Sequence, residues 1–145
     1  MGNSDTIMKT EINNEADRDK LTILIVDKKE TGSDLEKDIE RLGHRVLIAG
    51  NYTEALQKLS KTRFDLVVLD VDLTDGGRIK IISKIRTLAD DVNIVTMTNN
   101  NNREREQEIR DQRILYYAVK PLEFDEIRSI IDHISLKKKA NRKGE

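Results

Sequence analysis

The stretch Phe64-Asp65-Leu66-Val67-Val68-Leu69-Asp70 decides the fold of this chain of 145 residues. Its central residues are aliphatic without interruption, and two of them are β-branched. Such a run predicts a strand that is covered on both faces, which is typical of a parallel sheet. Asp70 then lies at the carboxyl end of a buried strand, where open parallel sheets place their functional sites.

Four further short runs of the same kind alternate with patterns typical of helices. The predicted strands are Thr22–Val26, Arg45–Ala49, Asn93–Met97 and Leu115–Val119. The helices between and after them are predicted from apolar residues at helical spacing: Leu35, Ile39, Leu42; Ala55, Leu56, Leu59; Ile79, Ile81, Ile82, Ile85; and Ile127, Ile130, Ile131, Ile134. Five β/α units predict an α/β fold with a doubly wound, five-stranded parallel sheet and helices on both faces.

Local signals predict where the first helices begin and end. Ser33 with Glu36 matches a capping box, and Gly43 provides a stop for the same helix. Asn51 is expected to cap the second helix. The segment 99–113 is almost entirely polar, with Ile109 as its only clearly apolar residue. We therefore expect a short, frayed or displaced helix there, or an exposed helix held by charge pairs.

Composition favours one domain, with a flexible extension over residues 1–20, a folded region over 21–136 and a basic tail over 137–145. A net charge of −1 and 3% aromatic residues argue against direct nucleic-acid binding. Cysteine is absent, which excludes disulfides and thiolate chemistry. No apolar run is long enough for a membrane span and no secretory signal is present, so a cytoplasmic protein without membrane contact is expected.

Four polar residues directly follow or end the predicted strands. Asp27 follows the first strand, Asp70 ends the third, Thr98 follows the fourth and Lys120 follows the fifth. Because parallel strands end at the same edge of the sheet, these side chains are expected to converge. A carboxylate attacks phosphorus only where the charges are neutralised, so a lysine and a metal ion beside Asp70 would suit a phosphate-receiving site.

These residues resemble the receiver domain of bacterial response regulators, the CheY-like family of two-component signalling. The resemblance covers about Leu21 to Ile134, and it rests on segments 23–27, 64–70, 75–76, 97–98 and 117–121. The resemblance implies that Asp70 accepts a phosphoryl group from a sensor histidine kinase or phosphotransfer protein, and that the chain signals to a downstream protein. It also implies that the Lys120–Pro121 peptide is cis; a trans proline starting the last helix is the alternative.

The resemblance also implies a role for each site residue. Thr98 bonds the phosphoryl oxygen, Lys120 pairs with it and Tyr117 is the aromatic that changes rotamer. By position in the family pattern, the resemblance implies a magnesium ion held by Asp27, by Asp70 and by the backbone carbonyl of Asp72.

Lys28 departs from this pattern, because it replaces a second acidic metal ligand and an ammonium cannot bind magnesium. Its side chain either points into the site and pairs with Asp70 or extends into solvent and leaves the metal one ligand short. The extra carboxylate of Asp72 is a possible compensation. We expect weaker magnesium affinity than in an ordinary receiver.

Two other functions fit parts of the sequence. Residues 70–74 also match the nucleophile motif of haloacid-dehalogenase-like phosphatases, but no acidic pair follows Lys120 as that family requires. A pseudo-receiver, which binds partners without phosphorylation, is favoured by Lys28 and by the polar segment 99–113. Retention of Asp70, Thr98 and Tyr117 with Lys120 favours a phospho-accepting domain, which is not expected to be an enzyme.

Overall fold

The computed structural model describes residues 19–74 and 77–143. Strands and helices alternate along these residues: β1 (Thr22–Val26), α2 (Lys29–Arg41), β2 (Arg45–Ala49), α3 (Tyr52–Lys61), β3 (Leu66–Asp70), α4 (Arg78–Leu88), β4 (Asn93–Thr98), α5 (Arg103–Arg110), β5 (Tyr116–Val119) and α6 (Phe124–Lys143). The strands form one five-stranded sheet in the order β2-β1-β3-β4-β5, and every neighbouring pair is parallel. The predicted α/β fold is confirmed.

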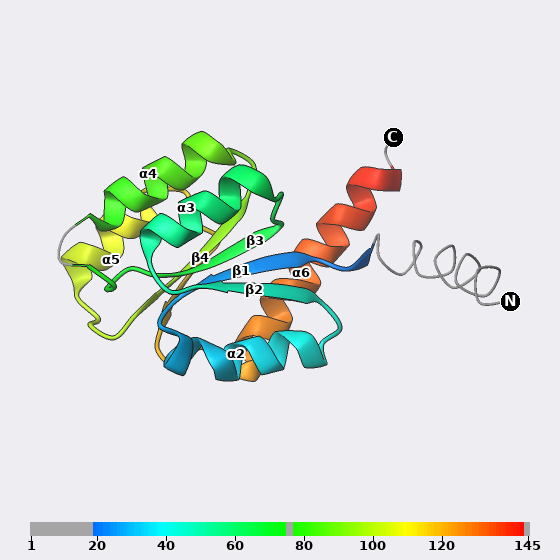
Figure 1. Cartoon of the computed structure of the whole chain (residues 1–145), viewed down its shortest axis with the longest axis horizontal. Coiled ribbons are helices and arrows are strands. Elements are labelled where there is room, and N and C mark those ends of the chain that lie inside the picture. The colour runs from blue at the N-terminus through cyan, green and yellow to red at the C-terminus, as the bar shows by residue number, and fades with distance from the viewer. Residues whose placement is uncertain (1–18, 75–76, 144–145) are drawn as a thin grey trace, which may run out of the picture.

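Helices cover both faces of the sheet (Figure 1). On one face, α3, α4 and α5 pack against the sheet through residues that include Ala55, Ile82 and Ile109. On the other face, α2 and α6 do so through residues that include Ile39 and Ile127. Successive residues of β3 point to opposite faces and all five are buried, which explains its unbroken apolar run.

The predicted start of α2 is wrong. The helix begins at Lys29 rather than near Ser33, and the hydroxyl of Ser33 donates to the carbonyl of Glu30 inside the helix. The first turn forms early because the carbonyl of Lys28 accepts the N–H groups of Thr31 and Gly32. Gly32 is buried in that turn, where an added Cβ would contact Ile25 of β1 at 3.5 Å. The hydrogen bonds to the carbonyl of Lys28 thus start the helix ahead of the capping-box pattern.

Two other predicted helix boundaries agree with the structure. Asn51 caps α3 by accepting the N–H of Glu54 at 2.8 Å. Gly43 follows the end of α2 with a φ of 91°, a left-handed conformation that favours glycine.

The polar segment between β4 and β5 forms a short helix. Helix α5 has 8 residues, Asn102 caps it, and Ile109 is its buried residue. An ion pair between Arg110 and Glu106 at 2.8 Å adds a contact along its exposed side. The helix is therefore short, as one alternative predicted, and carries a charge pair, as the other did.

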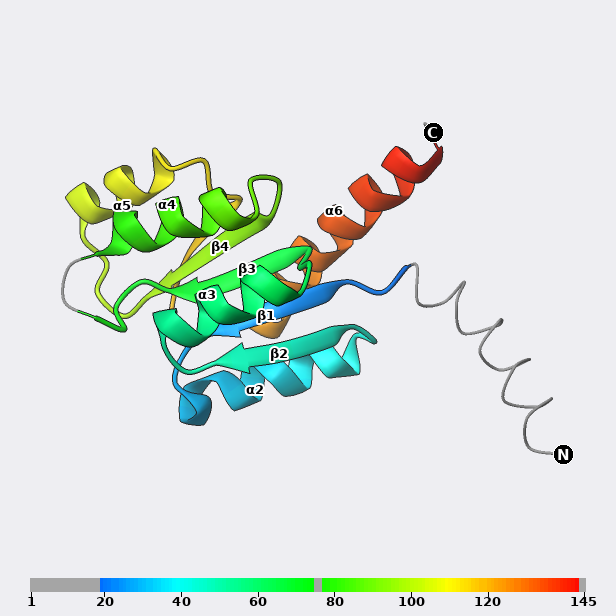
Figure 2. The same cartoon turned by 45° about the horizontal axis from the view of Figure 1, so that its top comes forward.

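Helix α6 continues past the starts of the strands, so that its last turns project beyond the sheet (Figure 2). Its basic residues Lys138 and Arg142 contact Asp65 and Asp19, and Lys138 also donates to the carbonyl of Lys20. Residues 137–143 thus belong to one helix with the preceding residues. The domain limits at 20 and 136 stay a prediction, and residues 1–18 and the Asp75-Gly76 segment lie outside the described residues. Within residues 19–74 and 77–143, no helix has the length and apolarity needed to cross a bilayer.

Candidate functional site

The sheet brings the predicted site residues to one edge. Asp27 directly follows Val26, which pairs with Leu69 of β3, the residue before Asp70. Because β1 and β3 are neighbours, the carboxylates that end them share the crevice at the carboxyl edge. Lys120 reaches the same crevice from the end of β5, and the Lys120–Pro121 peptide that follows it is cis, as the resemblance implies.

Lys120 bridges the two carboxylates. Its ammonium nitrogen lies 2.7 Å from Oδ2 of Asp70 and 2.9 Å from the carboxylate of Asp27. Asp27 and Asp70 are 2% and 4% exposed, so these charges are largely removed from water. One cation between two buried anions leaves the cluster with an excess negative charge, which favours a further cation or a change of charge at Asp70.

Burial and pairing act in opposite directions on the pKa values of this cluster. Burial raises the pKa of Asp70 above its usual value, and the hydrogen bond from Lys120 opposes that shift. For Lys120, burial alone would lower the pKa, but its hydrogen bonds to Asp70 and Asp27 raise it. Lys120 therefore stays charged at neutral pH and supplies a fixed positive charge beside Asp70.

Two further contacts fix Asp70 in place. The backbone N–H of Asp72 donates to its Oδ1 at 2.7 Å. The hydroxyl of Tyr52 donates to its backbone carbonyl at 2.8 Å, and burial raises the pKa of Tyr52 to about 12. Tyr52 therefore remains a neutral donor, and the end of β3 is held from α3 as well as from β1 and β5.

Lys28 does not enter the site. The residue is exposed, and no hydrogen bond or ion pair of its ammonium group is found among the described residues. Its backbone N–H donates to Oδ1 of Asp27 at 2.7 Å, so only its main chain takes part. This arrangement corresponds to the second predicted alternative, in which the side chain extends into solvent.

The carboxylate of Asp72 faces Thr98, Asn99 and Arg105. Its Oδ2 accepts the hydroxyl of Thr98 at 2.6 Å and the N–H of Asn99 at 3.1 Å, and its Oδ1 is hydrogen-bonded to Arg105. Burial alone would raise the pKa of Asp72, but the hydrogen bonds from Thr98, Asn99 and Arg105 hold it below the usual value. Asp72 is therefore a firmly ionised group whose oxygens are already occupied.

Tyr117 lies inward beneath α5. It is 7% exposed, and burial raises its pKa. The guanidinium carbon of Arg110 lies 5.4 Å from the centre of its ring, a cation–π distance. Its buried hydroxyl has no hydrogen-bond partner among the described residues, a state that favours movement if a partner becomes available.

Sequence reasoning missed Arg105 and Tyr52. Nothing in the charged run of α5 separates Arg105 from Arg103 by composition. Its spacing from Ile109 was the available signal, because residues four apart share one helix face and Ile109 was the obvious buried residue. Tyr52 carried no signal that distinguishes it from an ordinary first-turn residue.

The donor set fits a divalent cation only in part. Asp27 and Asp70 supply carboxylate oxygens, the ligand type that magnesium prefers. Among the described residues, however, no three side chains of His, Cys, Asp or Glu gather closely enough to hold a metal. A third carboxylate is missing because position 28 holds an exposed lysine and the carboxylate of Asp72 is bonded to Thr98 and Arg105.

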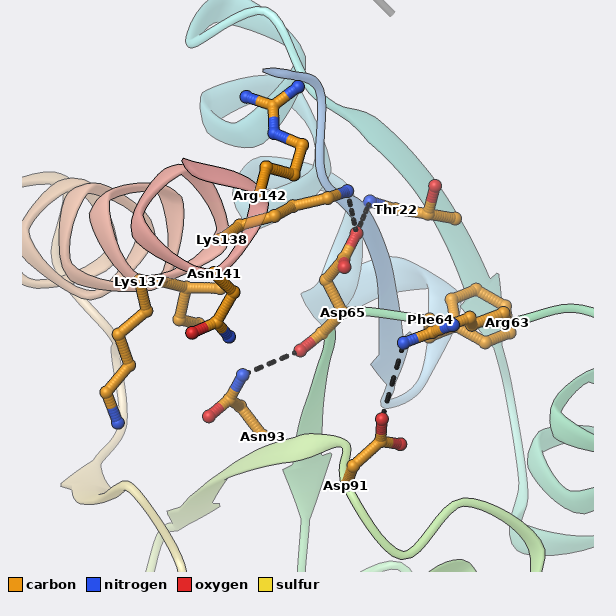
Figure 3. Close-up of a pocket in the computed structure, with 11 residues that line it drawn as sticks. Thr22, Arg63, Phe64, Asp65, Asp91, Asn93, Lys137, Lys138, Asn141 and Arg142 are labelled. Carbon is orange, nitrogen blue, oxygen red and sulfur yellow. Dashed lines mark hydrogen bonds and ion pairs between the residues drawn. The ribbon is translucent and has the colours of Figure 1, made fainter. Parts of the chain in front are cut away.

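Two surface hollows lie at opposite ends of the sheet. A hollow of about 400 Å³ borders Asp27, Met97, Lys120 and Pro121 at the carboxyl edge. A larger one, of about 660 Å³, lies between the starts of the strands and the last turns of α6 (Figure 3). There the carboxylate of Asp65 accepts the N–H of Thr22 and pairs with Lys138, while Asp91 pairs with Arg63. The larger hollow thus contains none of the predicted site residues.

Residues 23–132 match the family model of the response regulator receiver domain. Sporulation initiation phosphotransferase F of Bacillus subtilis is 28% identical over 97 residues, which are 67% of this chain and 78% of that protein. The transcriptional regulatory protein ZraR of Klebsiella oxytoca is 30% identical over 86 residues, 59% of this chain. The chain matches only 19% of the length of ZraR.

A solved structure supports the fold independently. The receiver domain protein (CheY-like) from Methanospirillum hungatei superposes with a TM-score of 0.75 at 22% sequence identity. The superposition covers 84% of this chain and 98% of that one. At this identity, the likeness shows the fold alone.

Proposed function

Because the chain belongs to the response regulator receiver domain family of two-component signalling, we propose that Asp70 accepts a phosphoryl group and that the chain signals by binding another protein. The observation that carries this proposal is the position of Lys120, whose ammonium lies 2.7 Å from a buried Asp70. A relative named a phosphotransferase also supports it. Receiver domains are signalling domains and generally not enzymes.

In the proposed transfer, an oxygen of Asp70 forms a bond to phosphorus while the bond from phosphorus to a histidine nitrogen of the donor breaks. The leaving imidazole takes up a proton. Lys120 stabilises the charge that gathers on the phosphoryl oxygens, and Thr98 supplies a neutral hydrogen-bond donor. The donor is a sensor histidine kinase or a phosphotransfer protein. The downstream protein would bind the surface formed by α5, β5 and α6.

Receiver domains generally bind Mg²⁺ at their acidic site. In this chain, Asp27, Asp70 and the backbone carbonyl of Asp72 are the groups that would hold it. A bound ion would neutralise part of the phosphoryl charge. We propose weaker binding than in an ordinary receiver, since Lys28 supplies no ligand and the carboxylate of Asp72 is already engaged with Thr98. We also propose a cytoplasmic location.

The contacts of Asp72 argue against the phosphatase alternative. That mechanism needs a residue at this position that gives and takes a proton. Hydrogen bonds from Thr98, Asn99 and Arg105 outweigh burial and keep the pKa of Asp72 low, so it is a poor proton donor at neutral pH.

Incubation with acetyl phosphate and magnesium, followed by intact mass measurement, tests the proposal. We expect one added HPO₃ unit on the native chain and none on Asp70→Asn. Lys28→Met is the matched control, because it removes an exposed lysine near the site and should leave the adduct intact. No adduct on the native chain, or an adduct that survives Asp70→Asn, would instead favour the pseudo-receiver.

A further inference from the structure

One carboxylate gathers donors from three separate parts of the site. Asp72 lies in the loop after β3 and accepts the hydroxyl of Thr98 at 2.6 Å and the N–H of Asn99 at 3.1 Å, both at the end of β4. Its other oxygen is paired with Arg105 of α5, and Nε of Arg78 in α4 lies 4.0 Å away. The side chains of Asp72 and Arg105 are 21% and 17% exposed, so the pair is shielded from much of the solvent.

We propose that Asp72 is a positioning residue that holds Thr98 and Arg105 before phosphorylation, and that a phosphoryl group on Asp70 displaces its side chain and releases both donors. This inference rests on the proposed function, because it needs Asp70 to receive the group. It assigns Asp72 a role different from that of a metal ligand, and it assigns Arg105 a role in transmitting the change to α5.

Proximity makes the two anions competitors. The backbone N–H of Asp72 already bonds Oδ1 of Asp70 at 2.7 Å, so the two residues are in direct contact. A phosphorylated Asp70 carries up to two negative charges and three phosphoryl oxygens in place of the single charge of its carboxylate, next to Asp72 with one charge. Repulsion drives the Asp72 side chain away and breaks its pair with Arg105, while Thr98 gains a stronger acceptor.

The loss of the Asp72 contact matters to α5 because this helix has few other attachments. Ile109 is its buried apolar residue, and Arg110 lies over the ring of Tyr117 at 5.4 Å. The ion pair from Arg105 to Asp72 is a third attachment. A helix of 8 residues cannot hold itself in water, so the loss of one attachment changes its position or its stability.

Hydrogen exchange of the α5 amides, followed by mass spectrometry, tests whether the Arg105–Asp72 ion pair stabilises α5. In the unmodified protein, Asp72→Asn and Arg105→Gln should each speed exchange in α5 about fivefold, the effect of losing one shielded charged hydrogen bond. The double variant should exchange no faster than either single variant, since both remove the same pair. Arg103→Gln, on the same helix and exposed, is the matched control and should leave α5 unchanged.

Beryllofluoride with magnesium, a mimic of the phosphoryl group, tests whether a phosphoryl group on Asp70 breaks the contact between Asp72 and Arg105. It should speed α5 exchange in the native protein and have little further effect in Arg105→Gln. Additive effects of the two single variants, or unchanged exchange in both, would overturn the proposal. An exchange rate of α5 in the native protein that does not change when beryllofluoride binds would also overturn it. The acetyl phosphate experiment tests Asp70 separately. If the protein takes up no phosphoryl group but the Asp72→Asn and Arg105→Gln variants still show non-additive exchange in α5, the proposed function is refuted. The ion pair between Asp72 and Arg105 would then still be supported as an anchor of α5.

Discussion

The ammonium nitrogen of Lys120 lies 2.7 Å from Oδ2 of Asp70, although the two residues are 50 positions apart in the chain. Both side chains are nearly excluded from solvent, with 12% and 5% exposed. This pair concentrates a fixed positive charge where the proposed chemistry develops negative charge, and it also controls the stability of the carboxyl edge.

Replacing Lys120 with methionine should lower the free energy of unfolding at pH 7 by about 3 kcal/mol, because it leaves Asp27 and Asp70 as buried carboxylates without a cation. Urea unfolding measures the change. Lys28→Met, which removes an exposed lysine, should stay within about 0.5 kcal/mol of the native protein. Equal losses in the two variants would contradict the bridging role of Lys120.

Replacing Lys28 with aspartate should strengthen magnesium binding about tenfold, since it adds a carboxylate beside Asp27 and removes a positive charge. Isothermal titration calorimetry measures the affinity. Lys29→Asp makes the same charge change one residue later, inside α2, and should have a much smaller effect. If the native protein bound magnesium as tightly as Lys28→Asp, the metal site would not be short of a carboxylate ligand.

His44 should make stability depend on pH. Burial lowers its pKa below 6.5, and Asp132 and Asp65 oppose this shift. Neutral His44 accepts the N–H of Leu21 through Nδ1 at 2.9 Å, so the folded state binds this proton less readily than the unfolded state. The free energy of unfolding should therefore fall as the pH drops below about 6.5.

Denaturant unfolding at several pH values, compared between variants, isolates this contribution. His44→Asn should remove the part of the pH dependence that lies in this range. His133→Asn, which changes the exposed histidine on α6, should retain it. A native profile that is flat from pH 7 to about 5 would count against the assignment.

Truncation of Ile109 to alanine should detach α5. Ile109 is 1% exposed, and the loss of a buried isoleucine side chain costs about 2 kcal/mol or more where the surroundings do not collapse. Hydrogen exchange of the α5 amides should be faster than in the native protein, while exchange in β3 should stay unchanged. Leu136→Ala, at a position 69% exposed, should leave both elements as they are. Undiminished protection of α5 in Ile109→Ala would show that its charged contacts suffice.

The sequence alone determined the sheet. Unbroken apolar runs such as Leu66–Leu69 have no stable place except a strand covered on both faces, and their alternation with helical patterns left one class of topology. The strand pattern also placed Asp27, Asp70, Thr98 and Lys120 at one edge, because strand ends are set by local pattern and parallel strands end together.

Tertiary structure alone decided which partner each charged side chain takes. Lys28 and Lys120 are equally basic in the sequence, yet one extends into solvent and the other lies between two buried carboxylates. Helix α2 likewise starts ahead of the predicted cap, with the carbonyl of Lys28 accepting the N–H groups of Thr31 and Gly32. Long side chains reach several positions from one backbone site, so their contacts depend on which distant elements pack beside them, a fact that no local pattern encodes.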